Sequence, residues 1–105
     1  MPRKKAKSRK AVPALATLVV MRLYIAAGAP NSVKAIANLE TICKKYLQKD
    51  FKLEVIDVLE FPLRALADGI LVTPSLSKIA PSPGTKIVGN LSDSSNVLVA
   101  LGIKP

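Results

Sequence analysis

The fold of this chain is decided by residues 17–26, TLVVMRLYIA, and by the turn after them, Ala27-Gly28-Ala29-Pro30-Asn31-Ser32. The first stretch is rich in β-branched and long apolar residues and holds one charge, Arg22. This composition predicts a strand buried on both faces, as at the centre of a sheet. Pro30 and Asn31 then stop the strand and open a helix, with Asn31 or Ser32 as the predicted N-cap.

A long helix and a second strand are predicted next. From Val33 to about Lys49, apolar residues recur at helical steps of three and four: Ile36, Leu39, Cys43 and Tyr46. Residues 52–58, KLEVIDV, alternate in the pattern of a strand. Strand, helix and strand form a βαβ unit, whose two strands run parallel with a right-handed crossover.

The C-terminal half predicts a short helix, a hairpin and a last helix. The short helix begins at Phe61-Pro62 and runs to about Asp68, before Gly69. A third strand starts near Ser75, residues 81–84 turn, and residues 86–89 return as a fourth strand. Ser92 or Asp93 caps the last helix, which ends at Gly102. The predicted class is α/β in the order βαβαββα, a mixed four-stranded sheet flanked by helices.

Length and charge predict one domain with a basic tail. The 105 residues carry a net charge of +9, of which six cations and no acid lie in residues 1–10. We expect residues 1–15 to be a disordered tail and residues 16–105 to be the domain, because blocks of like charge repel one another. Nucleic-acid binding by this tail remains an alternative, although only two Tyr and two Phe are present for base stacking.

Residues 1–29 also have the outline of an export signal, with a basic start, an apolar run and small residues. Pro13 and Arg22 interrupt the apolar run, and cleavage would remove the strongest strand, so we reject this interpretation. No apolar run approaches the ~20 residues of a membrane-spanning helix. One cysteine cannot form an internal disulfide, which fits a reducing, cytoplasmic setting.

Candidate catalytic and metal-binding residues are few. Cys43, the only thiol, falls mid-helix on the apolar stripe and is predicted to be buried; no histidine is present to activate it. The turn before the first helix lacks the glycine spacing of a phosphate site. The acids Glu54, Glu60 and Asp68 are expected to be solvated, with Asp57 partly covered. The sequence therefore predicts a non-catalytic protein without a metal or cofactor.

The order of elements resembles the thioredoxin-like fold, whose enzymes carry Cys-x-x-Cys where the first strand turns into the first helix. Here Ala27, Gly28, Ala29 and Pro30 occupy that turn. Thr73-Pro74, just before the third strand, matches the place where this fold holds a cis peptide. A thioredoxin-like adaptor without redox chemistry is thus one interpretation.

Residues 22–93 resemble the KaiB family of circadian clock proteins more closely. The matching pieces, in order and at matching spacing, are Leu23-Tyr24-Ile25-Ala26, Pro30-Asn31-Ser32-Val33-Lys34-Ala35, Val55-Ile56-Asp57-Val58-Leu59, Ile70-Leu71-Val72-Thr73-Pro74-Ser75-Leu76 and Ile87-Val88-Gly89-Asn90-Leu91-Ser92-Asp93. The resemblance implies a regulator that docks on a KaiC-like, RecA-type ATPase and modulates its ATPase and phosphorylation cycle. It also implies a homo-oligomer, dimer or tetramer, in equilibrium with a monomer, and an alternative fold in which the C-terminal half is rearranged.

The predicted docking surface covers Phe61 to Asp68 and the strand edge near Lys52, with Leu63 and Leu66 as apolar contacts beside Arg64. Three features differ from the clock members: Asp68 is the lone acid of the short helix, no acidic stretch precedes Pro105, and a basic tail stands in front. These differences favour a role outside a true oscillator, such as stress response.

Ala100 and Gly102 fall in the segment that rearranges in the family. Alanine favours a helix interior over glycine by up to ~1 kcal/mol. We therefore expect Ala100 to favour the thioredoxin-like form, with its final helix, over the rearranged fold.

Overall fold

The computed structural model describes residues 18–103, in which four strands and three α-helices follow one another in the predicted order. The predicted tail, residues 1–15, lies outside the described residues, so the division between tail and domain stays a prediction. The elements are β1 (Val19–Ile25), α1 (Pro30–Ile42), the π-helical turn η2 (Cys43–Leu47), β2 (Phe51–Asp57), α2 (Pro62–Ala67), β3 (Ser75–Ala80), β4 (Thr85–Val88) and α3 (Ser94–Leu101).

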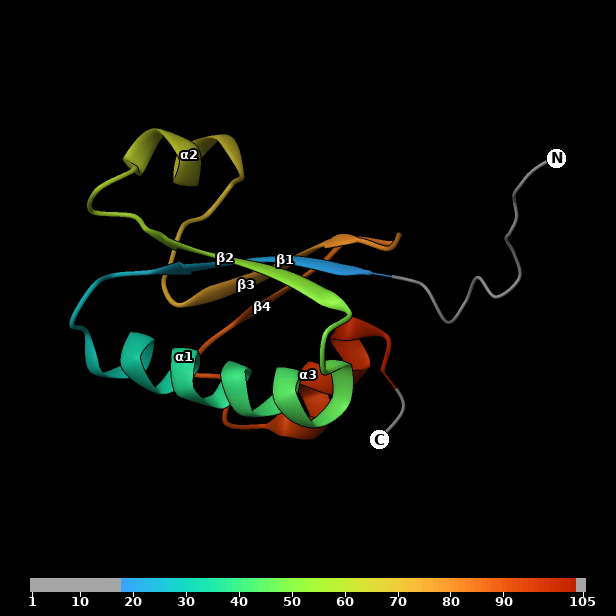
Figure 1. The fold of residues 1–105 in the computed structure, drawn as a ribbon. Helices are drawn as coiled ribbons and strands as arrows, with labels where there is room; N and C mark the ends of the chain where they lie inside the picture. Colours follow the sequence, from blue (N-terminus) through green and yellow to red (C-terminus); the bar gives the residue numbers. More distant parts are fainter. Residues whose placement is uncertain (1–17, 104–105) are drawn as a thin grey trace, which may run out of the picture.

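The four strands form one mixed sheet in the order β2-β1-β3-β4. β1 lies inside the sheet and pairs parallel with β2, from Val19 opposite Phe51 to Ile25 opposite Asp57. β3 pairs antiparallel with both β1 and β4. α1 and α3 cover one face of the sheet, and α2 lies on the other (Figure 1). The predicted α/β, thioredoxin-like architecture and its parallel βαβ unit are confirmed.

The two faces of the sheet carry cores of very different size. Between the sheet, α1 and α3 lies the larger core, which includes Met21, Leu23, Leu39, Val97 and Leu101. The core under α2 holds only four buried residues: Tyr24, Ile56, Ala65 and Ile70. α2 is therefore attached to the sheet by little apolar burial, a point that matters for the candidate site.

The first helix begins earlier than predicted. Ala29 is the N-cap and Pro30 the first helical residue, so the expected cap at Asn31 or Ser32 is wrong. Proline suits this place because its fixed φ is helical and its missing N–H would be unpaired there anyway. The Ser32 hydroxyl instead accepts a hydrogen bond from the backbone N–H of Ala26 at 3.1 Å, which joins the strand end to the helix.

The C-terminal half follows the prediction closely. The carboxylate of Asp93 caps α3 by accepting from the N–H of Asn96 at 3.2 Å, and Gly102 ends the helix in the left-handed conformation. The Thr73-Pro74 bond is cis, as predicted; the Ala80-Pro81 and Ser82-Pro83 bonds are also cis. The described residues thus adopt the form with a final helix.

Candidate docking surface

The turn that carries the dithiol in thioredoxin-like enzymes is inert here. Gly28 takes a positive φ of 82°, and the N–H of Ala29 closes the turn on the carbonyl of Ala26 at 3.0 Å. Cys43 lies elsewhere, in η2, and is buried as predicted. Burial, with a smaller effect of the Glu40 charge, raises the pKa of this thiol to about 11, so it stays protonated at neutral pH.

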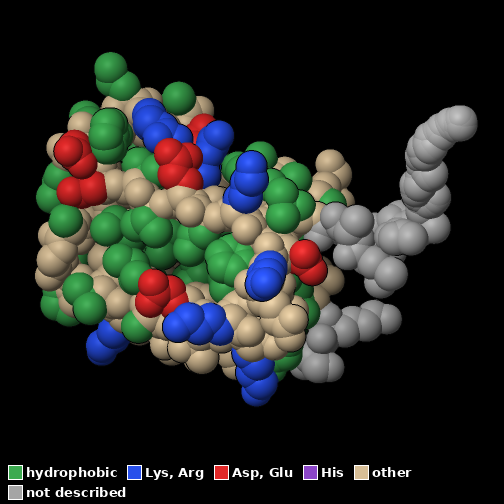
Figure 2. Space-filling model, in the orientation of Figure 1, with side chains coloured by type: hydrophobic (Ala, Val, Ile, Leu, Met, Phe, Trp, Pro, Cys, Tyr) green, Lys and Arg blue, Asp and Glu red, His purple; other side chains and the backbone are tan. Residues whose placement is uncertain are grey.

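Exposed apolar side chains gather around α2 instead. Of the 12 large apolar residues exposed in the described part of the chain, six lie between residues 59 and 72; we call these six the α2 surface: Leu59, Phe61, Leu63, Leu66, Leu71 and Val72. Leu63 and Leu66 are 78% and 67% exposed. Figure 2 shows apolar side chains projecting over α2, beside acidic and basic ones. Clustered exposed apolar residues with a polar rim mark an interaction site.

An ion pair joins the middle of α2 to the sheet edge. Nη1 and Nη2 of Arg64 donate to the two carboxylate oxygens of Glu54 on β2, at 2.7 and 2.9 Å. This hydrogen bond to Arg64 lowers the pKa of the Glu54 carboxyl, and the same bond raises the pKa of Arg64. Both side chains are about half exposed, so the pair orients α2 more than it stabilises the whole fold.

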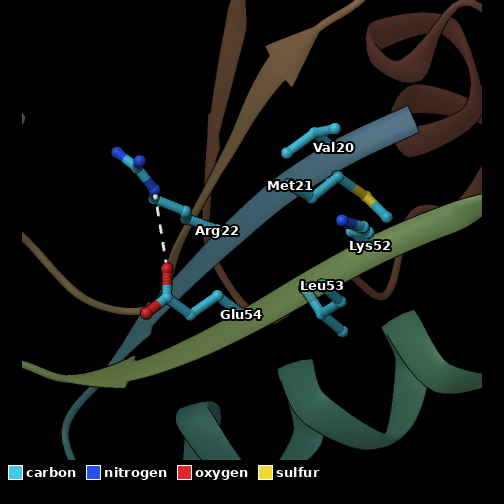
Figure 3. Close-up of a pocket in the computed structure, with 6 residues that line it drawn as sticks. All are labelled: Val20, Met21, Arg22, Lys52, Leu53 and Glu54. Atoms are coloured by element: carbon cyan, nitrogen blue, oxygen red, sulfur yellow. Dashed lines mark ion pairs between the residues drawn. The ribbon is translucent and has the colours of Figure 1, made fainter. Parts of the chain in front are cut away.

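Asp68 joins the C-terminal end of α2 to β1. Its Oδ2 accepts from Nη1 of Arg22 at 3.0 Å and from the hydroxyl of the fully buried Tyr24. Arg22 also forms an ion pair with Glu54 at 3.7 Å. In Figure 3, Arg22 and Glu54 lie on one side of the sheet, while Leu53 points toward α1 on the other. We call Arg22, Glu54, Arg64 and Asp68 the charge cluster.

A lysine from the hairpin completes the attachment of α2. Nζ of Lys86, on β4, donates to the backbone carbonyl of Asp68 at 2.6 Å. This carbonyl stands just past the end of α2, where a helix leaves acceptors unpaired and favours positive charge. Side chains from β1, β2 and β4 therefore hold a helix of only six residues in place.

The charge cluster corrects one expectation. Glu54 and Asp68 are engaged by arginines rather than simply solvated, whereas Asp57 is partly covered as predicted and accepts from the N–H of Leu59 at 3.0 Å. Sequence reasoning missed Arg22 and Tyr24 as partners of α2. The signal was present, because Arg22 is the lone charge of β1 and stands opposite Glu54 in the parallel pairing that the βαβ unit predicts.

The structure brings most of the predicted site residues together. Phe61, Leu63, Arg64, Leu66 and Asp68 all lie on or beside α2. Lys52 lies exposed on β2, where it and Glu54 help to line an open hollow of about 430 Å³ along β1 and β2 (Figure 3). The remaining predicted residues lie elsewhere: Pro30 and Asn31 open α1, Thr73 and Pro74 precede β3, Ala100 lies in α3 and Gly102 is its C-cap.

The described residues contain neither a metal-binding cluster nor a helix suited to span a membrane. Between residues 18 and 103, no three His, Cys, Asp or Glu side chains are grouped to hold a metal ion. Over the same range, no helix combines the length and the apolar character that crossing a membrane requires.

Comparison with known proteins identifies the family. The KaiB domain matches residues 22–103. The chain belongs to the KaiB family. It is 46% identical over 84 residues to the circadian clock oscillator protein KaiB of Gloeothece citriformis, which covers 80% of this chain and 79% of that protein. The KaiB of the Nostoc strain PCC 7120 is 48% identical over 84 residues, covering 80% and 78%.

Solved structures agree with the fold of this KaiB-family chain. The N-terminal domain of Synechococcus elongatus SasA superposes with a TM-score of 0.70 at 24% identity, over 92% of each chain. Mitochondrial thioredoxin 3 of Saccharomyces cerevisiae gives 0.66 at 15% identity, over 80% of this chain and 76% of that one. These likenesses concern the fold alone.

Proposed function

We propose that this KaiB-family chain is a non-catalytic regulator that docks through the α2 surface on a KaiC-like, RecA-type ATPase and modulates its ATPase and phosphorylation state. The observation that carries the proposal is the concentration of exposed apolar residues on and around one short helix. Leu63 and Leu66 offer apolar contacts, and Arg64 and Lys52 add charges around them. Membership of the KaiB family, whose named relatives are clock oscillator proteins, supports the choice of partner.

The way α2 is held also supports a docking role. A six-residue helix is too short to be stable alone, yet the charge cluster and Lys86 fix its position on the sheet. Pre-ordering a binding surface reduces the entropy lost when a partner binds. The inert turn at residues 26–29 and the buried thiol of Cys43 favour binding over redox turnover.

The proposal is tested by a pull-down with the cognate KaiC-like ATPase. Leu63→Asp places a charge at the centre of the α2 surface and should abolish binding, while the fold stays intact because this side chain is 78% exposed. Val99→Asp is the matched control, since Val99 is 74% exposed on α3, across the sheet. The wild type and the Val99 variant should bind and alter the rate of ATP hydrolysis. Absence of wild-type binding, or equal binding by the Leu63 variant, contradicts the proposal.

A further inference from the structure

Three exposed lysines gather at the end of the sheet that lies far from α2. Lys44 and Lys45 lie on η2, and Lys49 follows in the turn before β2. All three are exposed, and none forms an ion pair within residues 18–103. We call these three lysines the basic end. In Figure 1, η2 and the start of β2 lie at one end of the sheet and α2 at the other, so the basic end is separate from the α2 surface.

Acids are scarce around the basic end. Among residues 43–52, Asp50 is the single acid, and Glu40 stands one turn earlier, in α1. Four of the seven acids of the chain lie instead along β2 and around α2: Glu54, Asp57, Glu60 and Asp68. The C-terminal end of a helix favours positive charge, so lysines at η2 also suit the fold. The basic end is therefore a cationic surface that the charge cluster does not neutralise.

The chain enters the sheet beside the basic end. The N–H of Val19, the first residue of β1, bonds at 3.1 Å to the carbonyl of Asp50, the residue after Lys49. Residues 1–10, which lie outside the described residues, hold six cations and no acid. Lys10 stands eight residues before Leu18, so even a fully extended chain keeps it within about 30 Å of Leu18. Six cations from residues 1–10 and three from the basic end can thus reach one ligand.

So many cations suit a ligand that carries negative charges at regular spacing. Duplex nucleic acid carries one phosphate charge for about every 1.7 Å of its axis. Each lysine or arginine that neutralises a phosphate releases a condensed counterion, which favours binding without reading the base sequence. The ammonium and guanidinium groups would donate charge-assisted hydrogen bonds to the phosphate oxygens.

The aromatic residues favour a duplex over a single strand. Binding of single strands relies on exposed aromatic side chains that stack on the bases. Here Tyr24 is fully buried, Tyr46 and Phe51 pack half-buried against the larger core, and Phe61 lies beside α2. The described part of the basic end therefore offers no aromatic platform, whereas a duplex presents its phosphates on the outside and needs none.

The apolar residues favour nucleic acid over a lipid surface. Helices that bind at a membrane surface bury an apolar face between the headgroups, in addition to any attraction between charges. None of the exposed large apolar residues of the described chain falls between residues 34 and 54. The lysines on η2 thus stand without a neighbouring apolar anchor.

We propose that residues 1–10 and the basic end together bind the phosphate backbone of double-stranded nucleic acid, without base specificity. This site uses none of the residues of the α2 surface, so it does not depend on the docking proposed above. Its affinity is set by the number of phosphates that the cations contact, and is therefore strongly dependent on salt.

The proposal is tested by fluorescence anisotropy of a short labelled DNA duplex at several salt concentrations. If all nine cations contact phosphates, the logarithm of the association constant should fall against the logarithm of salt concentration with a slope of about −8. Deletion of residues 1–10 should reduce this slope to about −3, and joint replacement of Lys44, Lys45 and Lys49 by Gln should reduce it to about −5. A wild-type chain that does not bind the duplex at low salt, or a slope that either variant leaves unchanged, overturns the proposal.

Two further variants serve as controls. Lys34→Gln removes an exposed lysine near the start of α1, at the other end of that helix, and should keep the wild-type slope. Leu63→Asp should lose the ATPase yet bind the duplex with the wild-type slope, so failure of one proposal is distinguishable from failure of the other. The melting temperature of the triple Lys→Gln variant should change little, because all three side chains are exposed.

Competing ligands check the class of partner. Vesicles that contain phosphatidylglycerol, and a single strand of the same base sequence, are measured at the same salt concentration as the duplex. Both should bind the chain more weakly than the duplex does. Tighter binding of the vesicles would assign this surface to membranes, and tighter binding of the single strand would assign it to unpaired bases; either result contradicts the proposal.

Discussion

Arg64 on α2 reaches both carboxylate oxygens of Glu54 on β2, at 2.7 and 2.9 Å, and thereby orients the exposed helix that carries the α2 surface. Since only Ala65 of α2 is buried, this pair contributes much of what keeps the helix in one position.

Removing the Glu54 charge should loosen α2 without unfolding the domain. We expect Glu54→Gln to speed amide hydrogen exchange in α2 while β1 and α3 keep their protection, because exposed ion pairs add little to global stability. The melting temperature should change little. Glu60→Gln, an exposed acid without an ion pair in residues 18–103, is the control. Unchanged exchange in α2 contradicts this role for the pair.

Acid should release the same contact. Hydrogen bonding to Arg64 lowers the pKa of Glu54 from its ordinary value of 4.5, so the folded state binds protons less readily than the unfolded chain. The stabilising effect is therefore complete above pH 4.5 and is lost as the pH falls through the lowered value. NMR of the Glu54 carboxyl should show a midpoint below 4.5, together with line broadening in α2. In Arg64→Met the midpoint should return toward 4.5.

The Tyr24 hydroxyl should contribute measurably to the free energy of unfolding. Tyr24 is fully buried and donates to Asp68, so Tyr24→Phe removes a bond to a charged acceptor. We expect a loss of about 1.5 kcal/mol in the free energy of unfolding, measured by urea denaturation. Tyr46→Phe should be neutral, because the Tyr46 hydroxyl makes no hydrogen bond within the described residues. Equal effects of the two substitutions would argue against the bond to Asp68.

The thiol of Cys43 should be inert in the folded protein. It is buried in η2 and its pKa is raised to about 11, so a thiol-specific reagent at neutral pH should react only as the chain unfolds. The raised pKa also predicts that its contribution to stability is present below pH 9.0 and lost as the pH rises toward 11. Reaction as fast as that of a small-molecule thiol, or catalysed insulin reduction, would contradict the inert assignment.

Ala100 should support the final helix. It lies inside α3, one residue before the end at Leu101, so Ala100→Gly should lower the free energy of unfolding by up to about 1 kcal/mol. If Ala100 favours this fold over the rearranged one, NMR of the variant should also show a second set of signals from residues 85–101. A single set of signals with unchanged stability would remove Ala100 from that role.

Local patterns in the sequence were sufficient to predict the strands, the three α-helices and their order. Each of these signals acts on neighbouring residues alone: the apolar run of β1, the proline at the start of α2, and the Asp93 and Gly102 caps. Each could therefore be interpreted separately. The start of α1 was misplaced because Asn31 and Ser32 are good caps in general, while Pro30 fixed the first turn here and Ser32 bonded to Ala26.

The candidate site was only partly predictable. The exposed leucines of α2 followed from the resemblance to the family, but the charge cluster depends on pairs that are far apart in the chain, such as Arg22 and Asp68, 46 residues from each other. The bond between Tyr24 and Asp68 likewise joins residues that meet only once α2 folds back over the sheet. Such side-chain pairs depend on how the strands and helices pack against one another. The spacing of apolar residues along the sequence carries no information about that packing.

The contact between Lys86 and the carbonyl of Asp68 spans 18 residues of sequence and joins the hairpin to the far end of α2. Side chains from β1, β2 and β4 hold α2 on the sheet, so displacement of β4 removes one of these three attachments of the helix that carries Leu63 and Leu66. A spectroscopic probe placed on Leu66 should consequently register events at the hairpin, which makes α2 a reporter for the last third of the molecule.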